Sequence, residues 1–131
     1  MTATQTIHFD PTKGALTVQL LCGNAQPGSY DVSVLDPSML NVLEHWSGDF
    51  QSPTSDRHTI KTPLAQLDGA YIRLTSEVAL LPPYNTATVF VTVTQNGQKL
   101  GAPSDSETST ASSVEVDVTF ALSATPAGKP G

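Results

Sequence analysis

The feature that most constrains this chain is an alternation of apolar and polar residues with a period of two. It is clearest from Ser113 to Leu122. A period of two is typical of a β-strand with one buried face and one face in water. The pattern therefore predicts a core-facing group and a solvent-facing group. The first contains Val114, Val116, Val118, Phe120 and Leu122, and the second contains Glu115, Asp117 and Thr119.

Similar runs recur along the chain, separated by Pro, Gly and Asn residues that favour turns. About seven short strands of this kind predict an all-β fold, an antiparallel β-sandwich. A chain of 131 residues is long enough to bury one core without disulfides. The six strands expected besides 113–122 lie at residues 5–9, 15–21, 29–35, 57–61, 70–78 and 86–94.

The boundaries of this domain follow from composition. We expect a single domain at residues 1–123 and a flexible tail at 124–131, where Pro and Gly are frequent. Residues 101–113 hold Ser, Thr, Asp and Glu with almost no apolar content, which predicts a mobile acidic loop.

Residues 36–48 carry signals of a different kind. Asp36 can cap a helix, Pro37 can occupy its first position and Gly48 can end it. We therefore predict one short helix here, with a strand near residues 42–46 as the alternative. The apolar residues that fit one helical stripe are Met39, Val42, Leu43 and Trp46.

The stretch Leu67-Asp68-Gly69-Ala70-Tyr71 resembles the corner before strand F of immunoglobulin-like domains. It covers five residues and is one residue shorter than the usual spacing. Arg73 stands where an antibody-type domain has its second cysteine, and the chain has one cysteine, Cys22. The resemblance implies an immunoglobulin-like sandwich in the broad sense, without the inter-sheet disulfide.

Charge excludes several classes of partner. Six basic and twelve acidic residues give a net charge of −6, which disfavours nucleic acids and anionic membranes. No apolar run is long enough to span a membrane, so we expect no membrane insertion. Without a signal peptide in the chain as given, a cytoplasmic location is the default expectation, and an exported or surface-associated protein is the alternative.

Catalytic and cofactor motifs are not evident. The sequence has no Gly-x-Ser-x-Gly elbow and no phosphate-binding glycine loop. His8, His45 and His58 lack the spacing of a metal site, and we expect Cys22 to be an inert thiol that is buried or half-buried. We therefore expect that the protein is not an enzyme and that it binds no cofactor.

Four acidic residues are candidates for a calcium site. Carboxylates are the ligands that Ca²⁺ prefers, but the sequence lacks the Asp-rich loop of such sites. We read the four candidates as a solvated acidic surface. They are Asp105, Glu107, Glu115 and Asp117.

Exposed aromatic residues provide the best candidates for a contact surface. Tyr84 follows Pro82-Pro83 in a loop and has Asn85 beside it, and Phe90 interrupts the Thr-rich face of its strand. We expect a non-catalytic binding module, monomeric or weakly oligomeric, for a protein or carbohydrate ligand. The alternatives are a structural or surface-assembly subunit of a bacterial envelope component and, third, a small hydrolase built on His45 or His58.

Overall fold

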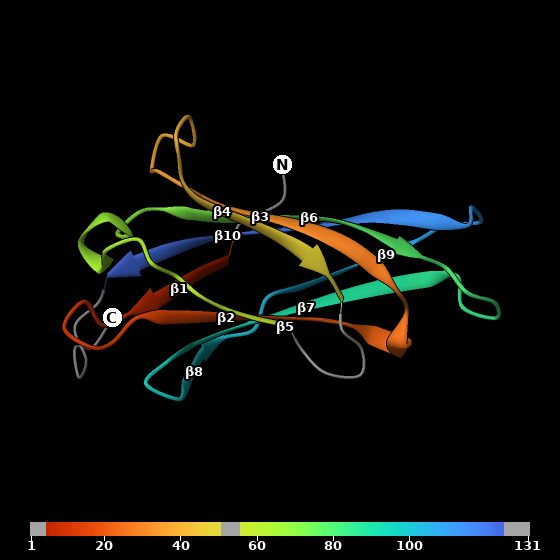
Figure 1. Cartoon of the computed structure of the whole chain (residues 1–131), viewed down its shortest axis with the longest axis horizontal. Coiled ribbons are helices and arrows are strands. Elements are labelled where there is room, and N and C mark those ends of the chain that lie inside the picture. The colour runs from red at the N-terminus through yellow and green to blue at the C-terminus, as the bar shows by residue number, and fades with distance from the viewer. Residues whose placement is uncertain (1–4, 51–55, 125–131) are drawn as a thin grey trace.

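The computed structural model describes residues 5–50 and 56–124, which form a β-sandwich of two five-stranded sheets (Figure 1). The all-β sandwich predicted from the alternation is confirmed, with ten strands in place of about seven. Sheet A has the order β1-β10-β6-β3-β4. Its strands are β1 (Gln5–Phe9), β3 (Gly28–Leu35), β4 (Val42–Asp49), β6 (Tyr71–Ala79) and β10 (Ser113–Ala124).

Sheet B is built around the strand β7, which pairs with β2 on one side and with β8 and β9 on the other. Its order is β5-β2-β7-β8, and β9 pairs with β7 as well. On one side, β7 meets β8 through residues 93–95 and β9 through residues 86–90. The strands are β2 (Leu16–Cys22), β5 (Asp56–Thr59), β7 (Thr86–Gln95), β8 (Gln98–Gly101) and β9 (Ser104–Thr108).

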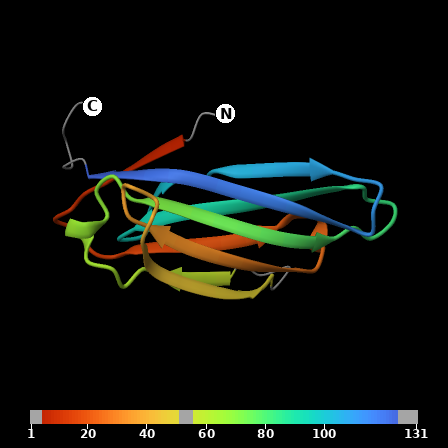
Figure 2. The same ribbon diagram turned by 90° about the horizontal axis from the view of Figure 1, so that it is seen from above.

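Sheet A is mixed and not purely antiparallel. The first strand, β1, runs parallel to the last, β10, whereas the other neighbours in sheet A are antiparallel. Figure 2 looks onto this sheet, with β10, β6, β3 and β4 side by side. The period of two predicts which face of a strand is buried, but it says nothing about which strand lies alongside and in which direction.

The core lies between the two sheets and follows the predicted alternation. In β10, Val116, Val118, Phe120 and Leu122 are buried while Glu115 and Asp117 are exposed. Burial of each large apolar side chain contributes about 1.5–3 kcal/mol. The largest fully buried apolar side chains are Phe9, Phe120, Ile7, Leu16, Leu20, Leu67, Ile72, Leu74 and Leu122.

The helix predicted at residues 36–48 is wrong. Strand β4 begins at Val42, which agrees with the alternative, and residues 36–41 form a turn. The Asp36 carboxylate caps this turn, accepting hydrogen bonds from Ser38 Oγ, from the amides of Leu40 and Asn41 and from Asn41 Nδ2. Met39 has a φ of 63°, which no α-helix accommodates.

Helical structure in the described residues is limited to two single turns. They are the 3-10 helices η1 (Gly23–Ala25) and η2 (Leu64–Gln66). No helix in these ranges has the length and apolar character needed to cross a membrane.

Residues 101–113, where we predicted a mobile loop, contain the strand β9. This edge strand is exposed along its whole length, so it needs no apolar residues. Hydroxyl pairs tie it to β7: Thr86 with Thr108 at 2.8 Å and Thr88 with Ser106 at 2.7 Å. At the other boundary, β10 extends to Ala124, and the tail predicted beyond it, at residues 125–131, lies outside the described residues.

Candidate functional site

The predicted contact residues Tyr84 and Asn85 lie together at one end of the sandwich, in the loop between β6 and β7. They line a hollow of about 440 Å³, which we call the end hollow. Tyr84 is 48% exposed and its neighbour Leu81 is 49% exposed. Both are large apolar surfaces left open to water. The hollow is lined by Leu80, Pro82, Pro83, Tyr84, Asn85, Ser109, Thr110, Ala111 and Ser112.

Backbone hydrogen bonds hold the walls of the end hollow in place. The amide of Ser109 donates to the Asn85 carbonyl at 2.9 Å, and the amide of Leu80 donates to the Ser112 carbonyl at 2.8 Å. The amide of Tyr84 donates to the Leu81 carbonyl at 2.9 Å. The loop that carries Tyr84 is therefore fastened to the segment between β9 and β10, and the hollow is already formed without a ligand.

The third predicted contact residue, Phe90, lies elsewhere. It is 43% exposed on the outer face of β7, between Leu21 of β2 and Ser104 of β9. Phe90 does not line the end hollow. The structure therefore brings two of the three predicted residues together and separates the third.

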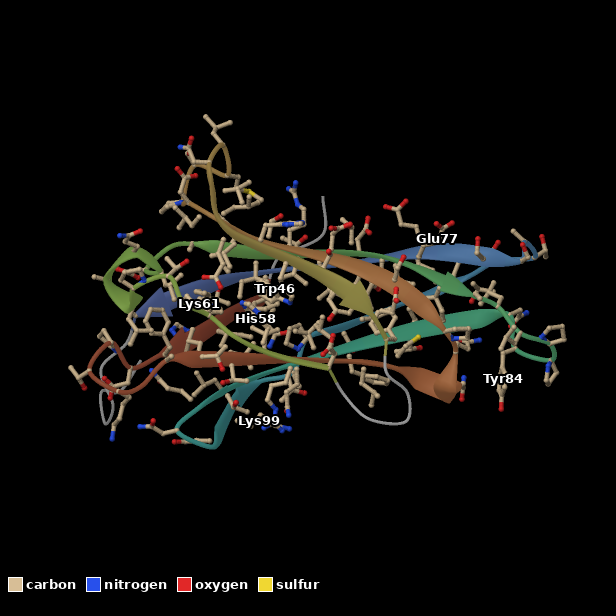
Figure 3. The ribbon with its side chains drawn as sticks, viewed as in Figure 1. Trp46, His58, Lys61, Glu77, Tyr84 and Lys99 are labelled. Atoms are coloured by element: carbon tan, nitrogen blue, oxygen red, sulfur yellow. The ribbon has the colours of Figure 1, made fainter. Side chains whose placement is uncertain are left out.

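A second hollow, of about 380 Å³, lies on the flank where the edge strands β4 and β5 face each other; we call it the flank hollow. The imidazole of His58 stacks on the indole of Trp46, with ring centroids 3.7 Å apart (Figure 3). Its Nε2 lies 2.7 Å from Oε2 of Glu44. The hollow is lined by Leu43, Glu44, His45, His58, Lys61, Thr62, Pro63 and Gln66.

The Glu44 carboxylate is the centre of this flank. It accepts hydrogen bonds from the amides of Lys61 and Thr62 and from Thr62 Oγ1, at 2.7–3.1 Å, in addition to its contact with His58. Desolvation acts to raise the pKa of this carboxyl, but the hydrogen bonds outweigh it and lower the pKa from 4.5 to about 2. Glu44 is therefore ionised at neutral pH and bonded within its own chain.

The flank brings a histidine, a carboxylate and a hydroxyl together, as the hydrolase hypothesis requires, but in a different order. In a catalytic triad the imidazole lies between the hydroxyl and the carboxylate, so that it can remove the hydroxyl proton. Here the Glu44 carboxylate lies between His58 and Thr62. His45 is placed apart from them, with its Nε2 3.0 Å from Oδ1 of Asp31.

The four candidates for a calcium site, which we read as a solvated acidic surface, are divided between the two sheets. Glu115 and Asp117 lie on β10 and Asp105 and Glu107 on β9. Within residues 5–50 and 56–124, no three His, Cys, Asp or Glu side chains gather as a metal site would need. A hydrogen bond with Asp117 and the charges of Asp117 and Glu77 raise the pKa of Glu115.

The expectation of a buried cysteine is confirmed. Cys22 is 2% exposed, and burial raises the pKa of its thiol to about 11. A thiol with this pKa is almost entirely protonated at neutral pH, whereas the thiolate is the nucleophilic form.

The chain matches no protein-family model, and comparisons with curated proteins and with solved structures gave no significant match. What the protein binds therefore has to be inferred from its own surfaces. The flank hollow uses Glu44, His58 and Thr62 for bonds within the chain. The end hollow instead is mostly apolar, and a half-exposed aromatic ring is part of its lining.

Proposed function

We propose that this protein is a non-catalytic binding module that takes an apolar element of a protein partner into the end hollow. The observation that carries the proposal is the half-exposed ring of Tyr84, which lines a mostly apolar hollow and belongs to a loop that backbone hydrogen bonds hold in place. Concave, mostly apolar sites with a few polar groups are the usual form of a binding pocket. Tyr84 supplies a ring and a hydroxyl, and Asn85 supplies an amide beside it.

Preformed walls favour binding because less conformational freedom is lost when the partner arrives. A tyrosine in such a place is typical of the few residues that dominate the free energy of an interface. Its truncation to alanine costs about 2 kcal/mol or more when the ring is fully covered by the partner. That corresponds to a loss of affinity of about 30-fold.

An immunoglobulin-like relationship is the finer proposal for the fold. It is supported by the corner before β6, where Asp68 Oδ1 accepts a hydrogen bond from the amide of Ala124 and Tyr71 begins the strand. The strand order departs from the pattern. Strands F and G of an immunoglobulin domain follow each other in the chain, whereas β7, β8 and β9 intervene between the neighbours β6 and β10.

The test is a screen of the purified chain against a displayed peptide library, with a glycan array run in parallel. The proposal expects a peptide family with an apolar anchor whose binding falls about 30-fold in Tyr84→Ala. Phe90→Ala is the matched control, since it removes an equally exposed ring outside the hollow, and it is expected to bind as the wild type does.

Each other outcome has a defined meaning. Peptide binding that survives Tyr84→Ala but is lost in Phe90→Ala would place the contact surface on the outer face of sheet B. Glycan binding that depends on Tyr84, without any peptide binding, would replace the protein partner by a carbohydrate. The absence of any Tyr84-dependent binding, whether to a peptide, a protein or a glycan, would contradict the proposal.

A further inference from the structure

A second exposed apolar feature lies near the other end of the sandwich. Residues 36–42, which we call the peg, form the turn between β3 and β4 together with the first residue of β4, and they rise clear of the body in Figure 1. Leu40 is 84% exposed and Val42 is 60% exposed, the two highest values among large hydrophobic side chains in the described residues. Two large apolar side chains exposed on one short segment make it a candidate for an interaction site.

The peg is held in one conformation by hydrogen bonds. The amide of Asp36 donates to the Asn41 carbonyl at 3.0 Å, and the amide of Met39 donates to the Asp36 carbonyl at 2.8 Å. Side-chain hydrogen bonds from Asn41 and Ser38 lower the pKa of Asp36 to about 2, so its carboxylate stays ionised and bonded at neutral pH. The Leu40 side chain is thus presented without a large ordering cost on binding.

The peg and the end hollow are separated by the length of strand β6. This strand starts beside the peg, where Tyr71 pairs with Leu35, and ends beside the hollow, where Val78 pairs with Gly28. Its nine residues span about 30 Å at the usual rise of a strand. One molecule cannot fill its own hollow over that distance, but the peg of another copy can.

The two ends of the molecule differ in charge. The half with the peg carries exposed cations at Lys13, Lys61, Arg73 and Lys99, and these roughly balance its carboxylates Asp10, Asp36, Glu44 and Asp68. In the half with the hollow, the described residues include carboxylates and no Lys or Arg. These carboxylates are Asp49, Glu77, Asp105, Glu107 and Glu115.

Figure 3 shows the same separation. Lys61 and Lys99 lie toward one end of the molecule, while Glu77 and Tyr84 lie toward the other. Arg57 lies between them, opposite Gln19 in the middle of β2. Two copies placed peg to hollow bring the cations of the nearly neutral half near the carboxylates of the negative half, whereas two hollow halves would repel each other. The charges therefore select the head-to-tail orientation.

We infer that the end hollow receives the peg of a second copy of this chain, so that copies join head to tail. The inference rests on the proposed function, because it names the partner of the same hollow. The contact joins two different surfaces of the molecule, so each added copy leaves one peg and one hollow open. Repetition of this contact produces a closed ring or an open filament, depending on the rotation between neighbouring copies.

The test uses two variants that each disable one half of the contact. Leu40→Ser removes the peg and keeps the hollow, while Tyr84→Ala weakens the hollow and keeps the peg. Sedimentation velocity is expected to show concentration-dependent oligomers for the wild type and monomers for each variant alone. A one-to-one mixture of the two variants is expected to form dimers and nothing larger. The peg of Tyr84→Ala can enter the hollow of Leu40→Ser, and the dimer then has no intact peg or hollow left for a third copy.

Ala111→Trp provides a second way to disable the hollow, by filling it from an exposed position on its wall. It is expected to behave as Tyr84→Ala does, both alone and in the mixture. Association of the wild type is also expected to weaken as salt rises from about 0.05 M to about 0.5 M, since exposed charges are screened. Circular dichroism of each variant verifies that the fold is intact.

Three results would overturn the inference. They are a wild type that stays monomeric at millimolar concentration, oligomers that persist in Leu40→Ser, and a mixture of the two variants that stays monomeric. Tyr84-dependent peptide binding by a monomeric wild type would remove the second copy as the partner and leave the proposed function in place. If the wild type shows neither self-association nor Tyr84-dependent peptide binding, both proposals are wrong.

Discussion

The imidazole of His58 lies almost parallel to the indole of Trp46, with an interplanar angle of 13° and ring centroids 3.7 Å apart. Trp46 belongs to the edge strand of sheet A and His58 to the edge strand of sheet B. The stack therefore joins the two sheets on a flank where the described residues form no backbone ladder between β4 and β5. Trp46 is the single tryptophan of the chain, so its fluorescence reports on this flank.

Replacing His58 by alanine is expected to shift the Trp46 emission to longer wavelengths, because water reaches the uncovered indole. The variant also removes one hydrogen-bond partner of Glu44. We expect a loss of about 1–2 kcal/mol in the free energy of unfolding, measured with urea. His45→Ala is the control, since His45 pairs with Asp31 and does not stack on Trp46. Equal emission shifts in both variants would contradict the role of the stack.

Replacing Glu44 by glutamine is expected to destabilise the protein at neutral pH by about 1–3 kcal/mol, because the ionised acceptor of the flank is lost. The pKa of Glu44 is about 2 in the folded state, below its ordinary value of 4.5. Its contribution is therefore fully present above about pH 4.5 and disappears as the pH falls toward 2. Urea unfolding across this range measures the difference between the wild type and the variant.

Two features make the Glu44 experiment specific. Glu107→Gln removes a carboxylate that is exposed on β9, and it is expected to change the stability little at any of these pH values. The difference in the free energy of unfolding between the wild type and Glu44→Gln should become smaller as the pH approaches 2. A gap that stays constant down to this pH would show that the charge of Glu44 is not what stabilises the flank.

The buried faces of the strands could be predicted from the sequence because burial and the period of two have the same cause. Val116 and Phe120 are apolar and point inward, whereas the charged Glu115 points outward, as the period of two predicts. The turn at Asp36 is harder to predict from the sequence. Asp36 and Pro37 cap helices and tight turns alike, so local signals do not separate the two, and pairing of β4 with β3 decides the outcome.

The sites were harder to predict than the faces. Tyr84 and Asn85 share a loop, so their proximity could be predicted, whereas the flank joins Glu44 and His58 from two sheets. The strand β9 carries no apolar side chain, so its pairing with β7 leaves no periodic signal. Contacts that depend on the arrangement of strands in space, and not on their patterns, are the ones the sequence does not reveal.

Replacing Glu115 by glutamine is expected to stabilise the protein slightly at pH 7. The hydrogen bond with Asp117 and the charges of Asp117 and Glu77 raise the pKa of Glu115 in the folded state. A raised pKa means that folding favours the protonated form. The penalty is thus absent at low pH and appears as the pH rises through the folded-state pKa.

Calorimetry checks this sign. The melting temperature of Glu115→Gln should exceed that of the wild type at pH 7, and the two should coincide near pH 3, where the carboxyl of the wild type is largely protonated. Added salt should shrink the difference at pH 7, since Glu115 is exposed on the outer face of sheet A. A variant less stable than the wild type at pH 7 would contradict the repulsion.

Replacing Gln26 by methionine is expected to stabilise the protein by about 1–3 kcal/mol. Gln26 is 1% exposed, and neither atom of its side-chain amide has a hydrogen-bond partner among the described residues. Methionine has nearly the same shape and no polar group to desolvate. Gln95→Met is the matched control at another buried glutamine. Its amide accepts from the amide of Asp10 and donates to the carbonyls of Asp10 and Gly14, at 2.8–3.0 Å.

The same substitution should therefore have opposite signs at the two sites. At Gln95 it leaves the Asp10 amide, which is in a buried contact, without its acceptor, so we expect a loss of about 2 kcal/mol or more. At Gln26 it removes two buried polar atoms that have no hydrogen-bond partner among the described residues, so the free energy of unfolding should rise. Urea unfolding of both variants measures the two signs. A loss of stability at Gln26 as large as that at Gln95 would mean that the Gln26 amide is satisfied in solution by groups such as water.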